Sequence, residues 1–264
     1  MKFYDQENKR LLLFEKKATA DFWDQHWQDN SIKTAKEARS YIVEKLTLRY
    51  LKKGSKVIDG GCGDGRNVIV LEKSGFESFG VDFAFKAIKH SQKIFPNLKL
   101  SCQDVCKTDF SDNFFDGYWS LGVIEHLWDG YGDIVKEAQR ILKKDGYFFV
   151  SFPYLSLIRK LKIALKKYPV FQEKNKAMDF YEFIFDANQI KKEISQAGFN
   201  FIKIYPYDVC KGLKSEISIW RSFFQNTYSS KSFFARVIRG TMSVFFSWAF
   251  GHIAILVFQN NKKY

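Results

Sequence analysis

Short apolar runs alternate with helical patterns along residues 56–153. Apolar runs bounded by turn residues predict buried strands, and apolar residues recurring every three or four positions predict helices between them. The predicted strands are 56–59, 78–81, 98–102, 115–121 and 147–152, and the predicted helices are 67–74, 84–94 and one through Ile134, Ala138 and Ile141. This α/β alternation predicts a parallel sheet with right-handed crossovers and helices on both faces.

The segment before this alternation has a helical pattern. Residues 1–50 are predicted to be helical, and their clearest signal is aromatic. Phe22, Trp23, His26 and Trp27 fall on about one helical face. The simplest interpretation is a helix that packs on the sheet.

Three predicted elements and two inserts follow residue 153. A capped amphipathic helix is predicted over 186–198, a strand over 199–205 and a buried strand over 253–258. The insert 154–168 is helix-like, with leucines on one side and Lys and Arg on the other, so its basic face meets solvent, an anionic membrane or an acidic substrate. The insert 207–250 carries too much apolar surface to leave in water, which predicts a cap, a dimer face or a membrane-facing patch. Its aromatic residues are Trp220, Phe223, Phe224, Tyr228, Phe233, Phe234, Phe245, Phe246 and Trp248.

The charge and the cysteines limit the partners and the compartment. The chain has 264 residues and a formal net charge of +13. Such an excess favours anionic partners, such as nucleic acid, anionic lipid or an acidic small molecule, or serves solubility. Cys62, Cys102, Cys106 and Cys210 contain no CxxC pair, which predicts reduced thiols and a cytoplasmic protein.

Two features bear on export and membrane insertion. Residues 1–10 lack the apolar core of a signal peptide. Residues 240–261 contain no charged side chain, so a membrane span has to be considered there. Gly251 and His252 interrupt that stretch, and the branched residues after them favour a helix followed by a buried strand.

The candidate chemistry starts at residues 57–65, which read VIDGGCGDG. A buried strand runs into a loop with glycines at three alternate positions, Gly61, Gly63 and Gly65, where backbone must come close to a ligand. The spacing differs from the dinucleotide fingerprint GxGxxG. Asp59 adds negative charge, which suits a ligand with a cationic group rather than a pyrophosphate.

The stretch Asp59–Gly65 resembles the first motif of the class I S-adenosylmethionine-dependent methyltransferases, acidic-x-Gly-x-Gly-x-Gly. The resemblance implies a Rossmann-like, doubly wound, mostly parallel seven-stranded sheet whose last strand runs antiparallel between its neighbours. It also implies S-adenosyl-L-methionine as cofactor and S-adenosyl-L-homocysteine as product. The expected domains are an N-terminal helical lid (1–50), the cofactor-binding core (51–206), a helical cap (207–250) and a terminal strand (251–264).

Each cofactor-binding residue expected from this resemblance has a physical role. Asp82, at the end of the second strand, can accept both hydroxyls of a ribose, and Phe83 can lie against adenine. Asp104 can accept from the adenine amino group while the Val105 N–H meets a ring nitrogen. Acids at such positions are otherwise turn residues or helix caps. The full expected set is Trp27 (as a lid aromatic), Asp59, Gly61, Gly63, Gly65, Asp82, Phe83, Asp104, Val105 and Leu121.

The catalytic candidates follow the fourth strand. Glu125 and His126 can form a general base with an orienting carboxylate, as an oxygen nucleophile requires, or can simply cap the next helix. Relatives with E-x-x-E-H here bind a divalent metal, but this chain has Gly122 where the first Glu stands. No metal site is therefore expected.

These residues predict a methyltransferase acting on a small-molecule, saccharide or lipid-linked acceptor, preferably at oxygen. RNA methylation is the alternative enzyme, favoured by charge, although no RNA-binding module or Arg-rich tract is visible. An inactive, cofactor-binding partner protein is the alternative of another class. The oligomeric state stays open.

Overall fold

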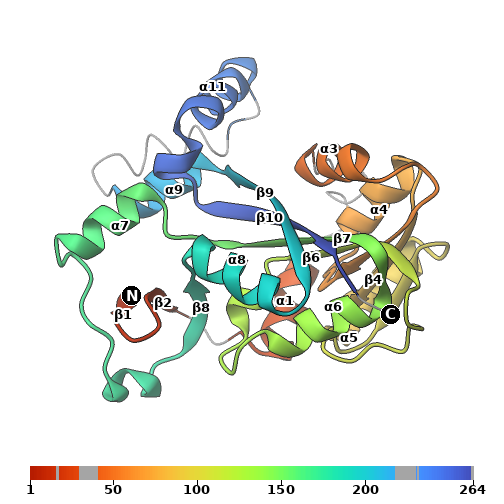
Figure 1. The fold of residues 1–264 in the computed structure, drawn as a ribbon, viewed down its shortest axis with the longest axis horizontal. Helices are drawn as coiled ribbons and strands as arrows, with labels where there is room; N and C mark the ends of the chain where they lie inside the picture. Colours follow the sequence, from red (N-terminus) through yellow and green to blue (C-terminus); the bar gives the residue numbers. More distant parts are fainter. Residues whose placement is uncertain (16–17, 30–40, 218–229, 231, 263–264) are drawn as a thin grey trace. The chain divides into compact units, whose positions relative to one another are not determined.

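The computed structural model describes residues 1–15, 18–29, 41–217, 230 and 232–262 (Figure 1). The chain divides into two compact units. The first unit contains Met1–Lys16, Ser151–Lys191 and Lys203–Leu256. The second unit contains Lys17–Val150, Lys192–Ile202 and Val257–Tyr264.

A seven-stranded sheet has the order β5-β4-β3-β6-β7-β10-β9. It is mixed and mostly parallel, with an antiparallel hairpin at its end, and the expected insertion of the last strand between two others is confirmed. Every strand predicted in residues 56–153, and both later ones, form. The strands are β3 (Lys56–Gly60), β4 (Glu77–Asp82), β5 (Lys99–Cys102), β6 (Phe115–Leu121), β7 (Leu142–Pro153), β9 (Phe199–Tyr207) and β10 (Ile253–Asn260).

The helices between these strands also form close to their predicted positions. Each has a narrow apolar face, so its buried residues pack on the sheet while its charged residues remain in water. They are α4 (Arg66–Lys73), α5 (Phe85–Ile94), α6 (Gly132–Ile141) and α8 (Ala187–Gln196), with a 3-10 turn η1 (Ile124–His126) before α6.

Strand β3 lies at the centre of the parallel part, and this placement fixes the site. It pairs in parallel with β4 and with β6, so Asp59 faces Gly80 on one side and Trp119 on the other. The indole of Trp119 is fully buried, stacks on Phe149 with ring centroids 4.2 Å apart, and donates through Nε1 to Thr47 Oγ1 at 2.9 Å. Thr47 belongs to α3 (Tyr41–Tyr50), which the indole thereby attaches to the sheet.

The expectation of a wholly helical segment over residues 1–50 is wrong at its start. Strands β1 (Lys2–Asp5) and β2 (Arg10–Phe14) form an antiparallel hairpin there. Strand β2 also pairs with β8 (Phe180–Ile184), which completes a three-stranded sheet. The helical periodicity begins only at Phe22 and belongs to α1 (Ala20–Asp29). Before it, the short run RLLLF buries Leu11, Leu12 and Phe14, as a strand between two neighbours does.

The two inserts contain shorter helices than the segments predicted. The first contains α7 (Leu157–Ala164), followed by the 3-10 turn η2 (Glu173–Ala177), and the second contains α9 (Val209–Glu216) and α11 (Phe233–Phe250). Within the described residues, every helix is too short or too polar to cross a membrane. Trp220, Phe223, Phe224 and Tyr228 lie outside the described residues, as do the side chains of Phe233 and Phe234.

A buried charge network joins the elements of the first unit. Arg159 of α7 is fully buried and donates through Nε to Glu216 Oε1 of α9 at 3.0 Å. Lys2 of β1 and Lys162 also form ion pairs with the Glu216 carboxylate, and the Tyr168 hydroxyl donates to it. Burial alone would raise the pKa of Glu216, but the charges of Lys2 and Arg159 hold it at about 2. One carboxylate thus compensates three cations.

Glu216→Gln should destabilise the protein by about 3 kcal/mol at pH 7, because it leaves buried cations without a counter-charge. Because the folded pKa is depressed to about 2, the contribution of Glu216 is present above the ordinary carboxyl range and is lost as pH falls toward 2. Thermal unfolding at pH 7 and pH 3 should therefore show a smaller difference between variant and parent at the lower pH. Glu173→Gln, in an exposed ion pair with Lys176, is the control and should have little effect. Equal melting temperatures for Glu216→Gln and the parent at pH 7 would contradict this account.

Candidate active site

The glycine loop follows the carboxyl end of β3, the strand that lies between β4 and β6. Its first turn is held by the backbone, since the N–H groups of Gly61 and Cys62 both donate to the Val81 carbonyl, at 2.8 and 3.0 Å. The loop then leads directly into α4. Parallel strands bring their carboxyl ends to one edge, which is where such sheets bind ligands.

The loop has the backbone conformation and the tight packing that require glycine. Gly61, Gly63 and Gly65 have φ angles of +83°, +54° and +74°. A Cβ on Gly61 would lie 2.4 Å from Val123, and one on Gly63 would lie 2.4 Å from the Trp27 indole. Side chains would therefore be strained and would also clash at both positions.

Asp82 ties this loop to the next strand and helix. Its Oδ2 accepts from the Gly63 N–H at 2.7 Å, and its Oδ1 accepts from the Ala84 N–H at 2.8 Å. Burial raises the pKa of Asp82, partly opposed by these backbone donors. The carboxylate reaches the cavity while holding the loop in place.

Asp59 is buried behind the loop and has unused capacity to accept. Its Oδ2 accepts from Asn67 Nδ2 at 3.2 Å, whereas its Oδ1 is buried with no hydrogen-bond partner. Burial raises the pKa of Asp59 to about 7, and the neighbouring charges of Asp82 and Asp64 act in the same direction. A cation placed near this carboxylate would offset both the cost of burying its charge and the repulsion from Asp82 and Asp64.

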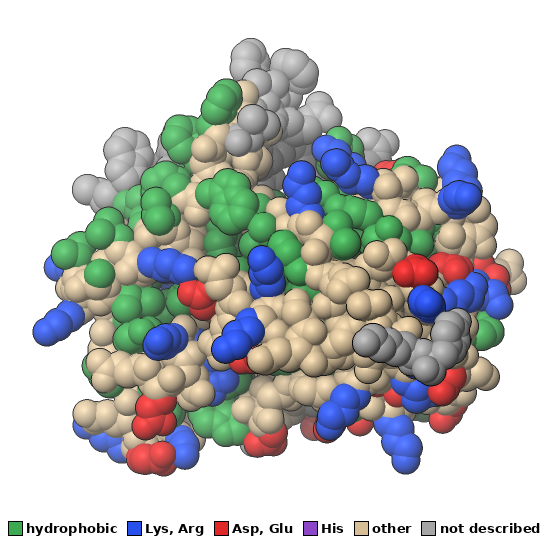
Figure 2. All heavy atoms as spheres, in the orientation of Figure 1, with side chains coloured by type: hydrophobic (Ala, Val, Ile, Leu, Met, Phe, Trp, Pro, Cys, Tyr) green, Lys and Arg blue, Asp and Glu red, His purple; other side chains and the backbone are tan. Residues whose placement is uncertain are grey.

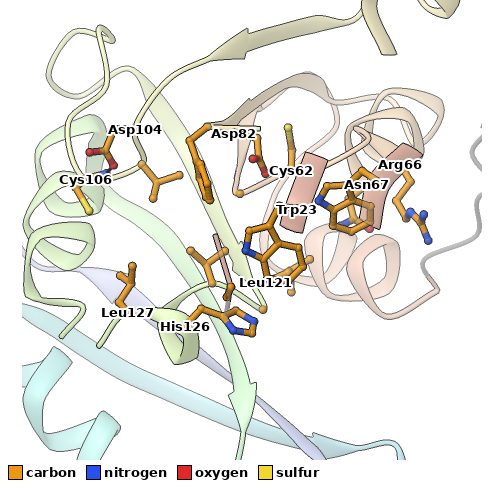
Figure 3. Close-up of a pocket in the computed structure, with 17 residues that line it drawn as sticks. Trp23, Cys62, Arg66, Asn67, Asp82, Asp104, Cys106, Leu121, His126 and Leu127 are labelled. Carbon is orange, nitrogen blue, oxygen red and sulfur yellow. Dashed lines mark hydrogen bonds between the residues drawn. The ribbon is translucent and has the colours of Figure 1, made fainter. Parts of the chain in front are cut away.

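A cavity opens at this edge of the second unit, and Figure 3 shows the residues around it. Among the predicted residues, those that line the cavity are Trp27, Gly61, Asp82, Phe83, Asp104, Val105, Leu121 and His126. Asp59, Gly63, Gly65 and Glu125 do not line it; the first three belong to the loop and strand beneath, and Glu125 is buried in η1.

One aromatic and one polar side chain of the cavity, Phe83 and Asp104, are exposed. The ring of Phe83 is 48% exposed, so one of its faces is available to a ligand. Asp104 Oδ1 accepts from the Cys106 N–H at 2.8 Å and so closes a tight turn. Val105 is the middle residue of this turn, and its side chain is buried.

Sequence reasoning missed nine residues of the cavity lining, and two groups among them show why. Cys62 lies within the glycine loop, and Arg66 and Asn67 follow it directly, so adjacency could have found these three. Val123 and Leu127 come from the irregular segment after β6, where no periodicity marks a side chain. The lining residues not predicted are Ala18, Trp23, Cys62, Arg66, Asn67, Cys106, Gly122, Val123 and Leu127.

Helix α1 supplies the aromatic wall of the cavity and is fixed by one buried acid. Asp24 Oδ1 accepts from the N–H groups of Lys86 and Ala87, at 2.9 and 3.3 Å, in the first turn of α5. These donors have no partner within their own helix. The attachment holds Trp23 and Trp27 of α1 at the cavity.

His126 lies at the cavity edge, packed against this wall. Its ring meets Trp23 edge to face, with centroids 5.0 Å apart and an interplanar angle of 71°. Glu125, its neighbour in η1, is buried. An imidazole in this position can receive a proton from a group bound in the cavity.

Comparisons with known proteins agree with this geometry. A family model described as a methyltransferase domain matches residues 58–150. A protein of Mycolicibacterium smegmatis named "Probable S-adenosylmethionine-dependent methyltransferase" is 28% identical over 115 residues, 44% of each chain. The demethylmenaquinone methyltransferase of Staphylococcus haemolyticus is 29% identical over 185 residues, 63% of this chain and 76% of that one.

The fold is similar to that of solved structures as well. A structure of an S-adenosylmethionine-dependent methyltransferase from Methanosarcina mazei superimposes with a TM-score of 0.57 at 13% identity, over 83% of this chain and 98% of that one. The match to the M. smegmatis protein spans 44% of its length, so the chain covers under half of that relative.

Asp59→Asn should remove the cost of ionising a buried carboxyl. Because the folded pKa of Asp59 is raised to about 7, the parent loses stability as pH rises from about 4 to about 7, and the full penalty applies above that range. The variant should gain between about 1 and 4 kcal/mol relative to the parent at pH 8 and almost nothing at pH 4. Denaturant unfolding across this range measures the difference. The exposed control Asp129→Asn should follow the parent, and an Asp59→Asn curve parallel to the parent at all pH values would refute the assignment.

Proposed function

Because this chain belongs to the class I S-adenosylmethionine-dependent methyltransferases, we propose that it transfers a methyl group from S-adenosylmethionine to a small-molecule acceptor, preferably at an oxygen atom. The observation that carries the proposal is the buried, unpartnered Oδ1 of Asp59 beside a loop that excludes side chains. This combination of negative charge and bare backbone suits a cationic amino-acid group better than a phosphate.

The residues present fit the cofactor part by part. Asp82 would hold the ribose hydroxyls, Phe83 would stack on adenine, and Asp104 with the Val105 N–H would receive the adenine edge. The loop from Gly61 to Gly65 would carry the amino-acid end. When bound, S-adenosylmethionine supplies an electrophilic methyl group on a sulfonium.

The chain's own contribution to the reaction is positioning and proton removal. Trp23 and Trp27 limit access of water to the cavity, and a well-oriented pair of reactants needs little further assistance. His126 would accept the proton of an acceptor hydroxyl, and Trp23 holds the imidazole in place. Glu125 would act as a positioning residue, since it is buried and does not line the cavity.

The acceptor class is supported by the names of curated relatives, which include methyltransferases of demethylmenaquinone, of phosphoethanolamine and of ubiquinone biosynthesis. These names point to small acceptors of differing chemistry. The net charge of +13 favours RNA as the second candidate acceptor.

Calorimetric titration should show binding of S-adenosylmethionine and S-adenosylhomocysteine. Phe83→Ala should weaken both about tenfold, because stacking on an aromatic ring contributes about 1 kcal/mol or more beyond its buried area. Phe85→Ala is a matched control, since Phe85 is an exposed aromatic residue only two positions along the chain and does not line the cavity. If neither ligand binds the parent protein, the chain is not an active member of its family and the partner-protein interpretation replaces the proposal.

His126→Gln should reduce methyl transfer by a factor of about 10² or more while leaving cofactor affinity within a factor of about two. Transfer of a labelled methyl group to fractionated metabolites, lipids and RNA measures it, with the exposed His90→Gln as control. A product in the RNA fraction that disappears after nuclease treatment and falls steeply with salt would establish the second candidate instead. Unchanged turnover in His126→Gln would remove the proton-acceptor role.

A further inference from the structure

Two helices of the first unit leave large apolar side chains in water. Leu157 and Leu161 of α7, and Leu165 at its C-cap, recur at every fourth position and are 67%, 58% and 58% exposed. On α11, Phe245 and Trp248 are 76% and 62% exposed. Helices α7 and α11 contact each other, so these five side chains belong to one part of the same unit. We call them the α7–α11 apolar surface.

Cations, and few anions, accompany this surface. Lys166 and Lys167 follow the C-cap residue of α7 and are exposed, and no acidic side chain of the described residues forms an ion pair with either. No Asp or Glu follows Glu216 in the chain, and Glu216 is itself buried among Lys2, Arg159 and Lys162. Figure 2 shows hydrophobic side chains gathered over α7 and the lower part of α11, with Lys and Arg side chains beside them.

We propose that the α7–α11 apolar surface docks peripherally on an anionic lipid membrane. Exposed leucines, a phenylalanine and a tryptophan beside lysines form the pattern of a helix surface that lies in the headgroup region, where the apolar groups leave water and the lysines meet lipid phosphates. Trp in particular favours this depth, because its ring is apolar and its N–H remains hydrated.

The same charges argue against other occupants. A second copy of the chain would place this surface against itself, and a two-fold contact would bring like-charged lysines together. A nucleic acid would satisfy the lysines but would leave five large apolar side chains without a partner. A membrane with anionic lipid satisfies both groups at once. This inference goes beyond the proposed methyl transfer and does not depend on it.

The test is flotation of the full-length protein with vesicles of phosphatidylcholine, with and without about 30% phosphatidylglycerol. The parent should float with the anionic vesicles and much less with the neutral ones. Leu161→Glu should lower the bound fraction at least about tenfold, because it replaces an inserted apolar group with an anion. The control Leu48→Glu alters an exposed leucine of α3, outside this surface, and should bind like the parent.

A charge series and a spectroscopic measurement complete the test. The double variant Lys166→Glu/Lys167→Glu should abolish the preference for anionic vesicles. The control is Lys52→Glu/Lys53→Glu, which changes two neighbouring exposed lysines of the second unit and should weaken the preference much less. Brominated lipids should quench the fluorescence component that Trp248→Phe removes. The proposal is overturned if the parent does not float with anionic vesicles, if Leu161→Glu binds them like the parent, or if Leu161→Glu only converts a dimer to a monomer in sedimentation.

Discussion

The two hydrogen bonds accepted by Asp82 are the constraint on which the site depends. A loop rich in glycine has few side chains of its own to fix its path, so an external group must select one conformation. The Asp82 carboxylate does this from the end of β4, receiving the N–H of Gly63 on one oxygen and that of Ala84 on the other. The acid expected to bind the ligand therefore also shapes the cavity that receives it.

The sheet was predictable because its strands are buried, apolar and bounded by turn residues. The edge hairpin was not, since β1 and β2 are only four and five residues long and their partner β8 lies far along the chain. The same distinction holds in the site. Asp82 and Phe83 could be predicted because they stand at the end of a predicted strand. Val123 and Leu127, in contrast, reach the cavity from a segment without periodicity. Packing between segments far apart in the chain determines where such residues lie, and a local sequence pattern does not predict that packing.

The charges of the chain are distributed unevenly over the molecule. Asp59, Asp64 and Asp82 gather in and behind the glycine loop of a protein whose net charge is +13. In the first unit, by contrast, a single buried carboxylate at Glu216 compensates Lys2, Arg159 and Lys162. The overall excess of positive charge therefore describes the surface, and it says little about the pocket, whose local potential is set by carboxylates held in low dielectric.

The capping of α5 by Asp24 links the position of a separate helix to two particular amide protons. Lys86 and Ala87 would have no acceptor from their own helix, because they lie in its first turn. While α1 is in place, these amides are bonded and their exchange with solvent is slow; each departure of α1 exposes them at once. Their protection from exchange therefore reports the free energy of displacing α1, and the aromatic wall with it, without any label on the wall itself.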